Sequence, residues 1–232
     1  MVDWIKFSKS FVVNRQDMMG DPGNSRRIRI TFGKRGALKY IGHLDLAKTW
    51  ERVLRRAQIN LTYSQGFVAR PHIQFASPLP LGITSECELI DVWLGGAFEI
   101  ESIVPKVNAV SPPGLPIYSA VEVPDRGPAL QTLVHSATYR ISFANILNLV
   151  LETQVNELLI QPAIIRTRRE KNYDLRPLII AVSIIGEGVL SVELSANEQT
   201  GVARADEFID ALGYNINEVE IHRFKLSLRP SS

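Results

Sequence analysis

Cysteine is almost absent from this chain, since Cys87 is the only one among 232 residues. One cysteine cannot form an intrachain disulfide, nor supply the several thiolates of a cysteine-only metal cluster. Long apolar runs are absent too: residues 178–185 have the length of a strand, not of the roughly 20-residue helix that spans a membrane. The first residues also lack the apolar core of a secretory signal. We therefore expect a cytoplasmic protein that has no membrane partner.

A large net charge is also lacking, because the formal charge at pH 7 is only +2. The charges are nevertheless unevenly spread. Residues 26–72 contain eleven Lys or Arg against two acidic residues, residues 73–165 contain three against nine, and residues 166–176 contain five against two. Such segregation indicates a basic surface patch that could bind phosphates. The alternative is that one strand and one helix have basic faces that are simply solvated.

The order of expected elements predicts the fold class. Residues 27–32 alternate apolar and polar side chains as a half-buried strand does, and residues 43–57 carry apolar side chains at helical spacing. The first half continues with extended segments at 60–63 and 72–76, a strand at 88–94, a helix at 98–107 and a strand at 117–123. This order, βαββαβ, is typical of a ferredoxin-like unit.

The second half repeats the element order without repeating the sequence. Strands are expected at 139–143, 163–168, 178–184, 189–194 and 218–228, and helices at 145–158 and 203–212. We therefore predict an α+β fold of two tandem ferredoxin-like (βαββαβ) lobes with antiparallel sheets. The predicted units are a flexible N-terminal extension (1–25), a first lobe (26–123), a linker (124–138) and a second lobe (139–232). Whether Met18 or Met19 is the true start stays open.

Several separate motifs follow one another in the first half. They are His43-Leu44-Asp45-Leu46, Glu51-Arg52-Val53-Leu54-Arg55-Arg56-Ala57, Tyr63-Ser64-Gln65-Gly66-Phe67 and Leu79-Pro80-Leu81-Gly82. In this order and spacing they resemble the radical-SAM-linked family, a domain of unknown function, and the resemblance extends over about residues 26–228. One departure lies at Val68, Ala69 and Arg70, where family members commonly have Asn-Pro-His.

The resemblance implies work beside a radical SAM protein. It also implies a link to RNA or to ribosome-associated components, by association only. A radical SAM enzyme holds its iron–sulfur cluster with three cysteine thiolates, which Cys87 alone cannot supply. We therefore expect no cofactor in this chain, and we expect S-adenosylmethionine and the iron–sulfur cluster only in a partner. The spacing of His, Asp and Glu gives no indication of a metal site.

His43 is the first candidate for a catalytic role. It stands at the expected helix start after Gly42, where backbone N–H groups and the helix dipole favour an anion. A neutral imidazole beside a phosphate could act as an acid or a base, and Asp45 could orient it. The alternative is that His43 and Asp45 merely cap the helix.

Basic and aromatic side chains suggest an RNA-binding surface. Aromatic rings stack on bases and arginines contact phosphates in single-stranded RNA recognition. The candidates are Lys39, Arg52, Arg55, Arg56, Tyr63, Arg70, His72, Arg168 and Arg169. The leading hypothesis is a non-catalytic accessory protein that binds RNA or a ribonucleoprotein and presents a substrate to a radical SAM enzyme. The alternatives are a metal-independent endoribonuclease of tandem ferredoxin-like type, and a protein-docking module without nucleic acid.

Overall fold

The computed structural model describes residues 25–63 and 69–229. The expected N-terminal extension, apart from Ser25, lies outside the described residues, and so do residues 64–67 of the third motif. The described strands are β1 (Arg26–Lys34), β2 (Ile73–Phe75), β3 (Thr84–Leu94), β4 (Ile117–Val123), β5 (Val134–Phe143), β6 (Ile165–Arg168), β7 (Lys171–Asp174), β8 (Ile179–Gly186), β9 (Val189–Asn197), β10 (Gly201–Val202) and β11 (Val219–Leu228). The described α-helices are α1 (His43–Arg56), α2 (Ile103–Asn108), α3 (Leu130–Leu133), α4 (Asn148–Leu159) and α5 (Ala205–Ala211).

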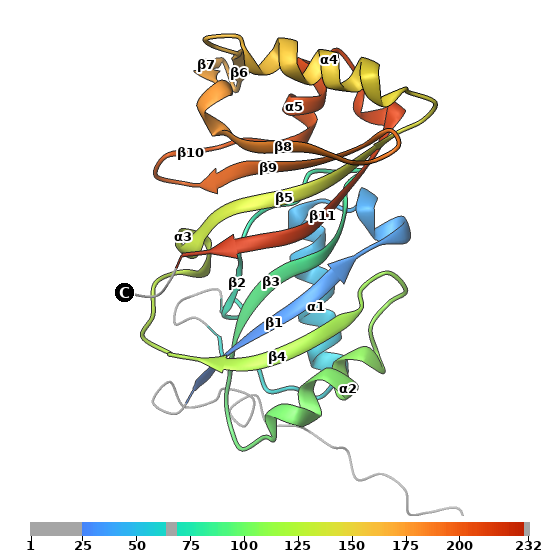
Figure 1. Cartoon of the computed structure of the whole chain (residues 1–232). Coiled ribbons are helices and arrows are strands. Elements are labelled where there is room, and N and C mark those ends of the chain that lie inside the picture. The colour runs from blue at the N-terminus through green and yellow to red at the C-terminus, as the bar shows by residue number, and fades with distance from the viewer. Residues whose placement is uncertain (1–24, 64–68, 230–232) are drawn as a thin grey trace, which may run out of the picture.

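Nine of these strands form one sheet, in the order β10-β9-β5-β11-β3-β1-β4, with β2 added beside β3 and β8 beside β9. All pairings in it are antiparallel except the contact of β11 with β3, which is parallel and joins only His222 with Thr84 and Arg223 with Ser85. β6 and β7 form a separate hairpin. In Figure 1 the sheet runs from β4 to β8, with α1 behind β1 and β3, and α4 and α5 beyond β8 and β9.

The prediction of an α+β fold with mainly antiparallel strands is confirmed. Two separate sheets are not found, because β11 carries the sheet of the second half into that of the first. Each half does repeat one strand order: β4-β1-β3-β2 in the first and β11-β5-β9-β8 in the second. The description as two tandem ferredoxin-like lobes stays a prediction, as does the division into domains. The expected linker at 124–138 contains α3 and the first residues of β5.

Two clusters of buried apolar side chains stabilise the two halves. In the first, Ile28, Ile30 and Phe32 of β1 pack against α1, where the Trp50 ring meets Phe32 edge-on at 4.9 Å. The second cluster joins β5, β9 and β11 to α4 and α5. Burial on this scale contributes roughly 1.5–3 kcal/mol per large apolar side chain. In the described part of the chain, no helix combines the length and apolarity needed to cross a membrane.

The predicted apolar stripe of α1 was wrong at its first residue. Leu46, Trp50 and Val53 form the buried stripe, at steps of four and three residues, together with Leu54. Leu44 is 75% exposed, because six residues before Trp50 places it far around the helix from that stripe. The second helix is also shorter than expected. A 3-10 turn (Ile100–Ser102) precedes α2, and Pro105 fits the first turn of α2, where its missing N–H has no intrahelical partner.

Candidate functional site

A groove lies where residues 77–80, which precede β3, meet the second half of the chain. Its volume is about 790 Å³, and we call it the junction groove. Pro78, Leu79 and Pro80 form one part of its lining, which we call the groove wall, and Tyr139 of β5, the β9–β10 region and the β6–β7 hairpin contribute the rest. Four cationic side chains line it, together with Glu198: Arg168, Arg169, Lys171 and Arg204. Pockets between structural units, with apolar walls and a few polar groups, are common binding sites.

Arg168 is fixed in place by several contacts. Its Nε donates to Glu207 Oε1 at 2.8 Å, its Nη1 to the Val202 carbonyl at 3.0 Å and its Nη2 to the Tyr173 hydroxyl at 2.9 Å. Tyr173 in turn donates to Glu207 Oε2 at 2.5 Å. Burial, and then the hydrogen bond to Glu207, raise the pKa of Tyr173 to about 12. Arg168 is therefore largely neutralised by Glu207 and serves the groove as a support for the hairpin.

Arg204 is similarly paired, with two hydrogen bonds to the Asp206 carboxylate at 2.9 and 2.8 Å. Arg169 and Lys171 differ, because both are exposed at the tip of the β6–β7 hairpin. Arg169 and Glu170 have φ values of +49° and +64°, as a tight two-residue turn requires. In residues 25–63 and 69–229 neither cation has an ion-pair partner, so both are available to an anionic ligand.

A buried ion pair holds the wall of the groove. The Arg223 side chain of β11 is only 1% exposed and binds both oxygens of Glu88 of β3, at 2.8 and 2.5 Å. Its Nη2 also donates to the Ser77 carbonyl at 3.2 Å, directly beside Pro78. Burial raises the pKa of Tyr139, which also lines the groove, and the nearby Arg223 charge opposes that shift. The pair thus links both halves of the chain to the start of the groove wall.

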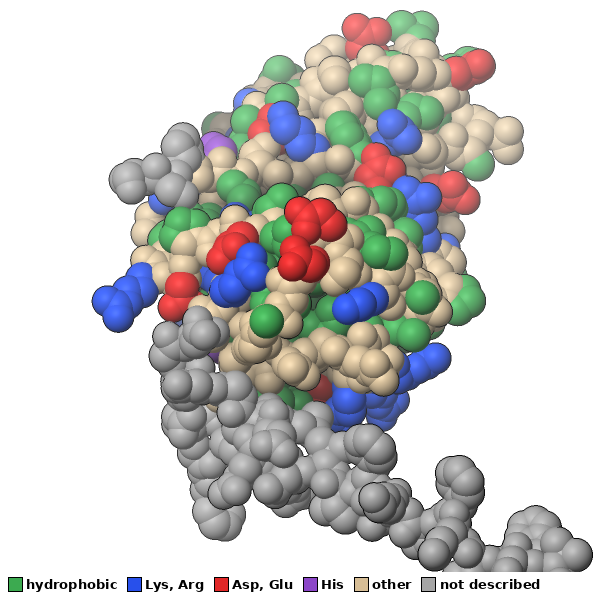
Figure 2. Space-filling view, turned by 90° about the horizontal axis from the view of Figure 1, so that it is seen from below, with side chains coloured by type: hydrophobic (Ala, Val, Ile, Leu, Met, Phe, Trp, Pro, Cys, Tyr) green, Lys and Arg blue, Asp and Glu red, His purple; other side chains and the backbone are tan. Residues whose placement is uncertain are grey.

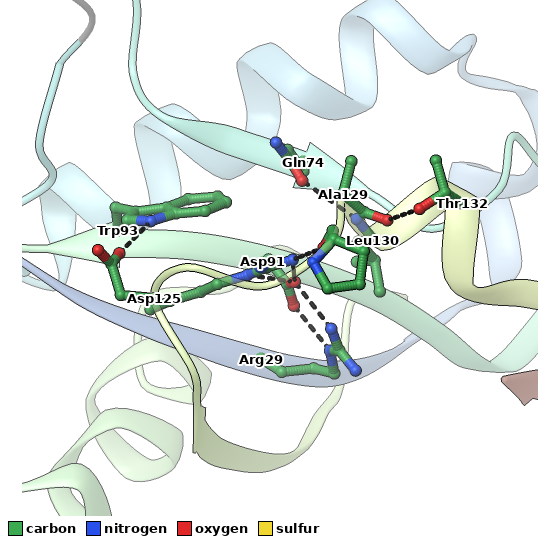
Figure 3. A network of polar contacts seen from close by, with 10 residues as sticks. Arg29, Gln74, Asp91, Trp93, Asp125, Ala129, Leu130 and Thr132 are labelled. Atoms are coloured by element: carbon green, nitrogen blue, oxygen red, sulfur yellow. Dashed lines mark hydrogen bonds and ion pairs between the residues drawn. The ribbon is translucent and has the colours of Figure 1, made fainter. Parts of the chain in front are cut away.

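A second buried network lies farther along β1 and β3 (Figure 3). The Asp91 carboxylate is fully buried and accepts hydrogen bonds from Arg27 Nε at 2.9 Å and from Arg29 Nε at 2.8 Å. Arg27 also donates to the Pro128 carbonyl at 3.0 Å and lies over the Trp93 ring. The network therefore fastens the 124–129 segment to the sheet. All three ionic groups are used in structural contacts.

His72 packs onto this network. Its ring stacks on Trp93, with 3.7 Å between centroids and 7° between planes, and Trp93 Nε1 donates to Asp125 at 2.7 Å. Burial lowers the pKa of His72, while the Asp125 charge opposes the shift. These contacts give His72 a structural role on the first half, and they do not bring it to the junction groove.

His43 and Asp45 are not joined by any hydrogen bond between described residues. The N-cap of α1 is Gly42, which has no side chain to accept a hydrogen bond from the first turn, so neither His43 nor Asp45 occupies the N-cap position. The Asp45 carboxylate lies 3.4 Å from Lys48 Nζ and is mostly exposed, whereas the His43 ring meets Phe75 edge-on at 4.9 Å. Burial and then the charge of Lys34 lower the pKa of His43, which keeps the imidazole neutral at pH 7. Asp45 does not orient His43 in this structure.

The other predicted cations are scattered over the first half. Arg52 and Arg56 are exposed on α1, while Arg55 is paired with Glu51 at 2.6 Å. Lys39 lies over the Tyr40 ring. Tyr63 forms a bridge with Pro71, and Arg70 is exposed close by. None of these side chains lines the junction groove. On the visible part of the face in Figure 2, basic and acidic side chains are interspersed, so that face has no patch of a single sign.

Of the site residues predicted from the sequence, the structure places only Arg168 and Arg169 in the lining of the groove. Lys171 and Arg204 were missed as site residues. The basic run at 166–171 was a signal for Lys171, but Arg204 stands alone in the sequence. Among the described residues, no group of three or more His, Cys, Asp and Glu could hold a metal ion. Burial raises the pKa of the Cys87 thiol to about 11, which keeps it protonated and unreactive.

The comparison with known families identifies one match. Residues 27–204 match the family model described as an uncharacterized protein conserved in bacteria (DUF2344). No curated protein matches the chain. The family description names no radical SAM enzyme, RNA or reaction, so the match supports the expected domain of unknown function and nothing finer. It spans most of the chain and ends before α5 and β11. The chain therefore belongs to the DUF2344 family of uncharacterised bacterial proteins.

Proposed function

We propose that this protein is a non-catalytic accessory that binds single-stranded RNA in the junction groove. The observation that carries the proposal is the pair of exposed cations, Arg169 and Lys171, which have no ion-pair partner among the described residues and line the same groove as Pro78, Leu79 and Pro80. Phosphates provide the charge that such cations bind, and bases provide flat apolar faces for Pro78 and Pro80. Glu198, which also lines the groove, limits its net charge, and this favours a weak, salt-sensitive complex.

We further propose that the bound RNA is presented to a separate radical SAM protein in the cytoplasm. S-adenosylmethionine and the iron–sulfur cluster would then belong to that partner. This part rests on the motif resemblance at residues 43–82 and on the single cysteine, whose raised pKa does not suit a metal thiolate. In this arrangement the chain supplies position and charge, and the partner supplies the chemistry.

The groove is tested with two charge-matched double variants. The variant Arg169→Ala/Lys171→Ala should weaken binding of a labelled, mixed-sequence oligoribonucleotide by about tenfold, because it removes two phosphate contacts. The control Arg52→Ala/Arg56→Ala removes the same charge from exposed positions of α1. Its affinity should stay within about twofold of the wild type, since nonspecific attraction alone changes little at such a distance. Fluorescence anisotropy at low salt measures both.

The two variants separate the alternatives. If the α1 variant loses affinity and the groove variant does not, RNA binds on α1 and the groove proposal is wrong. If the wild type does not bind RNA even at low salt, the protein-docking hypothesis takes its place. Circular dichroism of both variants should match the wild type, because all four side chains are exposed and none forms an ion pair with another described residue.

The endoribonuclease alternative leads to an expected negative result. Purified protein incubated with mixed cellular RNA in a chelator should release no fragments. The reason is that His43 packs against Phe75 with no hydrogen-bonded acid or base beside it among the described residues. Cleavage that survives the chelator and disappears in His43→Ala would contradict the accessory role. A positioned acid or base contributes about 10²–10⁴-fold in rate, so the loss would be plain.

A further inference from the structure

The β6–β7 hairpin, which carries Arg169 and Lys171, lies outside the main sheet. In the described chain its two strands pair only with each other, from Ile165 opposite Asp174 to Arg168 opposite Lys171. Backbone pairing therefore fixes the shape of the hairpin but not its place beside the junction groove. Side-chain contacts with the rest of the chain have to fix that place.

One face of the hairpin is directed at α5. Arg166 and Arg168 are two residues apart on β6, so their side chains share this face. Tyr173 and Lys171 stand opposite them in the ladder and belong to the same face. Arg168 and Tyr173 both bind Glu207 of α5. Lys171 lies in the last pair before the turn, and among the described residues it has no ion-pair partner.

Glu207 is the residue through which α5 holds this face. Its two oxygens accept separate hydrogen bonds, Oε1 from Arg168 at 2.8 Å and Oε2 from the Tyr173 hydroxyl at 2.5 Å. Arg168 also donates to that hydroxyl at 2.9 Å, so the three side chains form a closed ring of hydrogen bonds. A second acid of α5, Asp210, lies 3.6 Å from Arg166 and is 75% exposed, which makes it a weak partner.

The ring of contacts also reaches the lining of the groove. Arg168 donates to the carbonyl of Val202, and Val202 lines the junction groove. The carboxylate that orients Arg168 therefore orients the hairpin relative to the site itself. Glu207 is not among the residues that line the groove, and its side chain is only 18% exposed.

We propose that Glu207 is a positioning residue for RNA binding, which fixes the hairpin on α5 and so holds Arg169 and Lys171 at the junction groove. The inference rests on the proposed function, because it concerns the same two cations. Groups that are already held in the binding geometry lose less freedom when the ligand arrives, so they bind it more tightly. This role is opposite to that of an acidic charge acting alone, which repels phosphates.

The sign of the effect of Glu207→Ala on RNA affinity decides the role. If only the charge of Glu207 mattered, its loss would tighten binding of the labelled oligoribonucleotide, by about twofold at low salt. If Glu207 positions the hairpin, the same change should weaken binding about threefold to fivefold, because the two cations then make only part of their phosphate contacts. Fluorescence anisotropy with the full chain measures the affinity.

Asp206→Ala is the matched control. Asp206 and Glu207 are neighbours in the first turn of α5, so each variant removes one negative charge from the same place. Asp206, however, binds Arg204 and not the hairpin. Its variant should bind RNA as tightly as the wild type or more tightly. The two substitutions are therefore expected to shift the affinity in opposite directions.

A second control separates positioning from a general loss of structure. Glu207→Ala added to Arg169→Ala/Lys171→Ala should not weaken binding further, because the cations that it positions are already absent. A general effect on the fold would lower the affinity in both backgrounds. Should Glu207→Ala fold poorly, Tyr173→Phe takes its place: it removes the hydroxyl from the ring without changing the charge, and it should weaken binding about twofold to threefold.

Hydrogen exchange without RNA measures the attachment of the hairpin directly. The amides of residues 165–174 should exchange faster in Glu207→Ala than in the wild type, and at the wild-type rate in Asp206→Ala. Unchanged exchange in Glu207→Ala would show that α5 does not hold the hairpin through this residue.

The RNA measurements distinguish failure of this role from failure of the proposed function. If Arg169→Ala/Lys171→Ala weakens binding and Glu207→Ala does not, the proposed function stands and the positioning role is wrong. Equal weakening in Glu207→Ala and Asp206→Ala would also contradict it, because the effect would then belong to the helix as a whole. If Arg169→Ala/Lys171→Ala binds as tightly as the wild type, the proposed function fails and the positioning role fails with it.

Discussion

Arg223→Ala is expected to destabilise the fold by about 3–5 kcal/mol, the cost of leaving a buried partner charge unpaired. Glu88 is buried opposite Arg223, and the two residues join β3 to β11 where the halves of the sheet meet only through two residue pairs. Loss of the guanidinium also frees the Ser77 carbonyl, at the start of the groove wall. Urea denaturation followed by circular dichroism measures the change.

The control for this variant is Arg204→Ala. Arg204 also forms a two-bond pair, with Asp206, but its side chain is 42% exposed. Pairs accessible to solvent contribute only about 0–1 kcal/mol, so the loss should be small. The variant Arg223→Met/Glu88→Leu should recover part of the stability lost in Arg223→Ala, because it removes both buried charges. Equal losses in Arg223→Ala and Arg204→Ala would show that the buried pair does not stabilise the junction.

Asp91→Ala is expected to cost a similar amount, about 3–5 kcal/mol. Asp91 is the shared acceptor of Arg27 and Arg29, and Arg27 is itself only 2% exposed. Without the carboxylate, two cations remain on one face of the sheet with no compensating charge. We also expect the 124–129 segment to loosen, since Arg27 holds the Pro128 carbonyl. Limited proteolysis should then cut this segment faster.

Glu122→Ala is the matched control on the same part of the sheet. Glu122 pairs with Arg26, and its side chain is 46% exposed, so solvent screens the pair and its removal should leave the free energy of unfolding close to that of the wild type. Proteolysis of the 124–129 segment should stay at the wild-type rate in this variant. If Asp91→Ala behaves like Glu122→Ala, the buried network does not fasten the segment.

Local patterns were enough to predict most elements of the fold. Helical spacing at 43–57 predicted α1, and the turn at Gly186-Glu187-Gly188 separated the strands that became β8 and β9. Such features depend on neighbouring residues and therefore show in the sequence. Leu44 was misassigned because it lies three residues before Ala47 and six before Trp50, which fits a helical repeat in the sequence. The buried stripe reaches Trp50 from Leu46 instead, at a step of four residues.

The junction groove could not be predicted, because it depends on tertiary structure. Residues 77–80 and the hairpin tip at 169–171 are far apart in the sequence, and only the join of β11 with β3 brings their halves together. Arg223 and Glu88 likewise appear in the sequence as isolated charges within strands. The same limit explains why a basic run at 26–72 suggested one patch, whereas Arg27, Arg29 and Lys34 are mostly buried in structural contacts.

The salt dependence of RNA binding tests the central claim most directly. Anisotropy titrations of the wild type and of Arg169→Ala/Lys171→Ala, made at several salt concentrations, give the slope of log affinity against log salt. Each phosphate contact with a single strand contributes about −0.7 to this slope. The wild type should therefore show a slope steeper by about 1.4 than the double variant. Equal slopes in the two proteins, or a wild type with no slope, would contradict RNA binding in the junction groove.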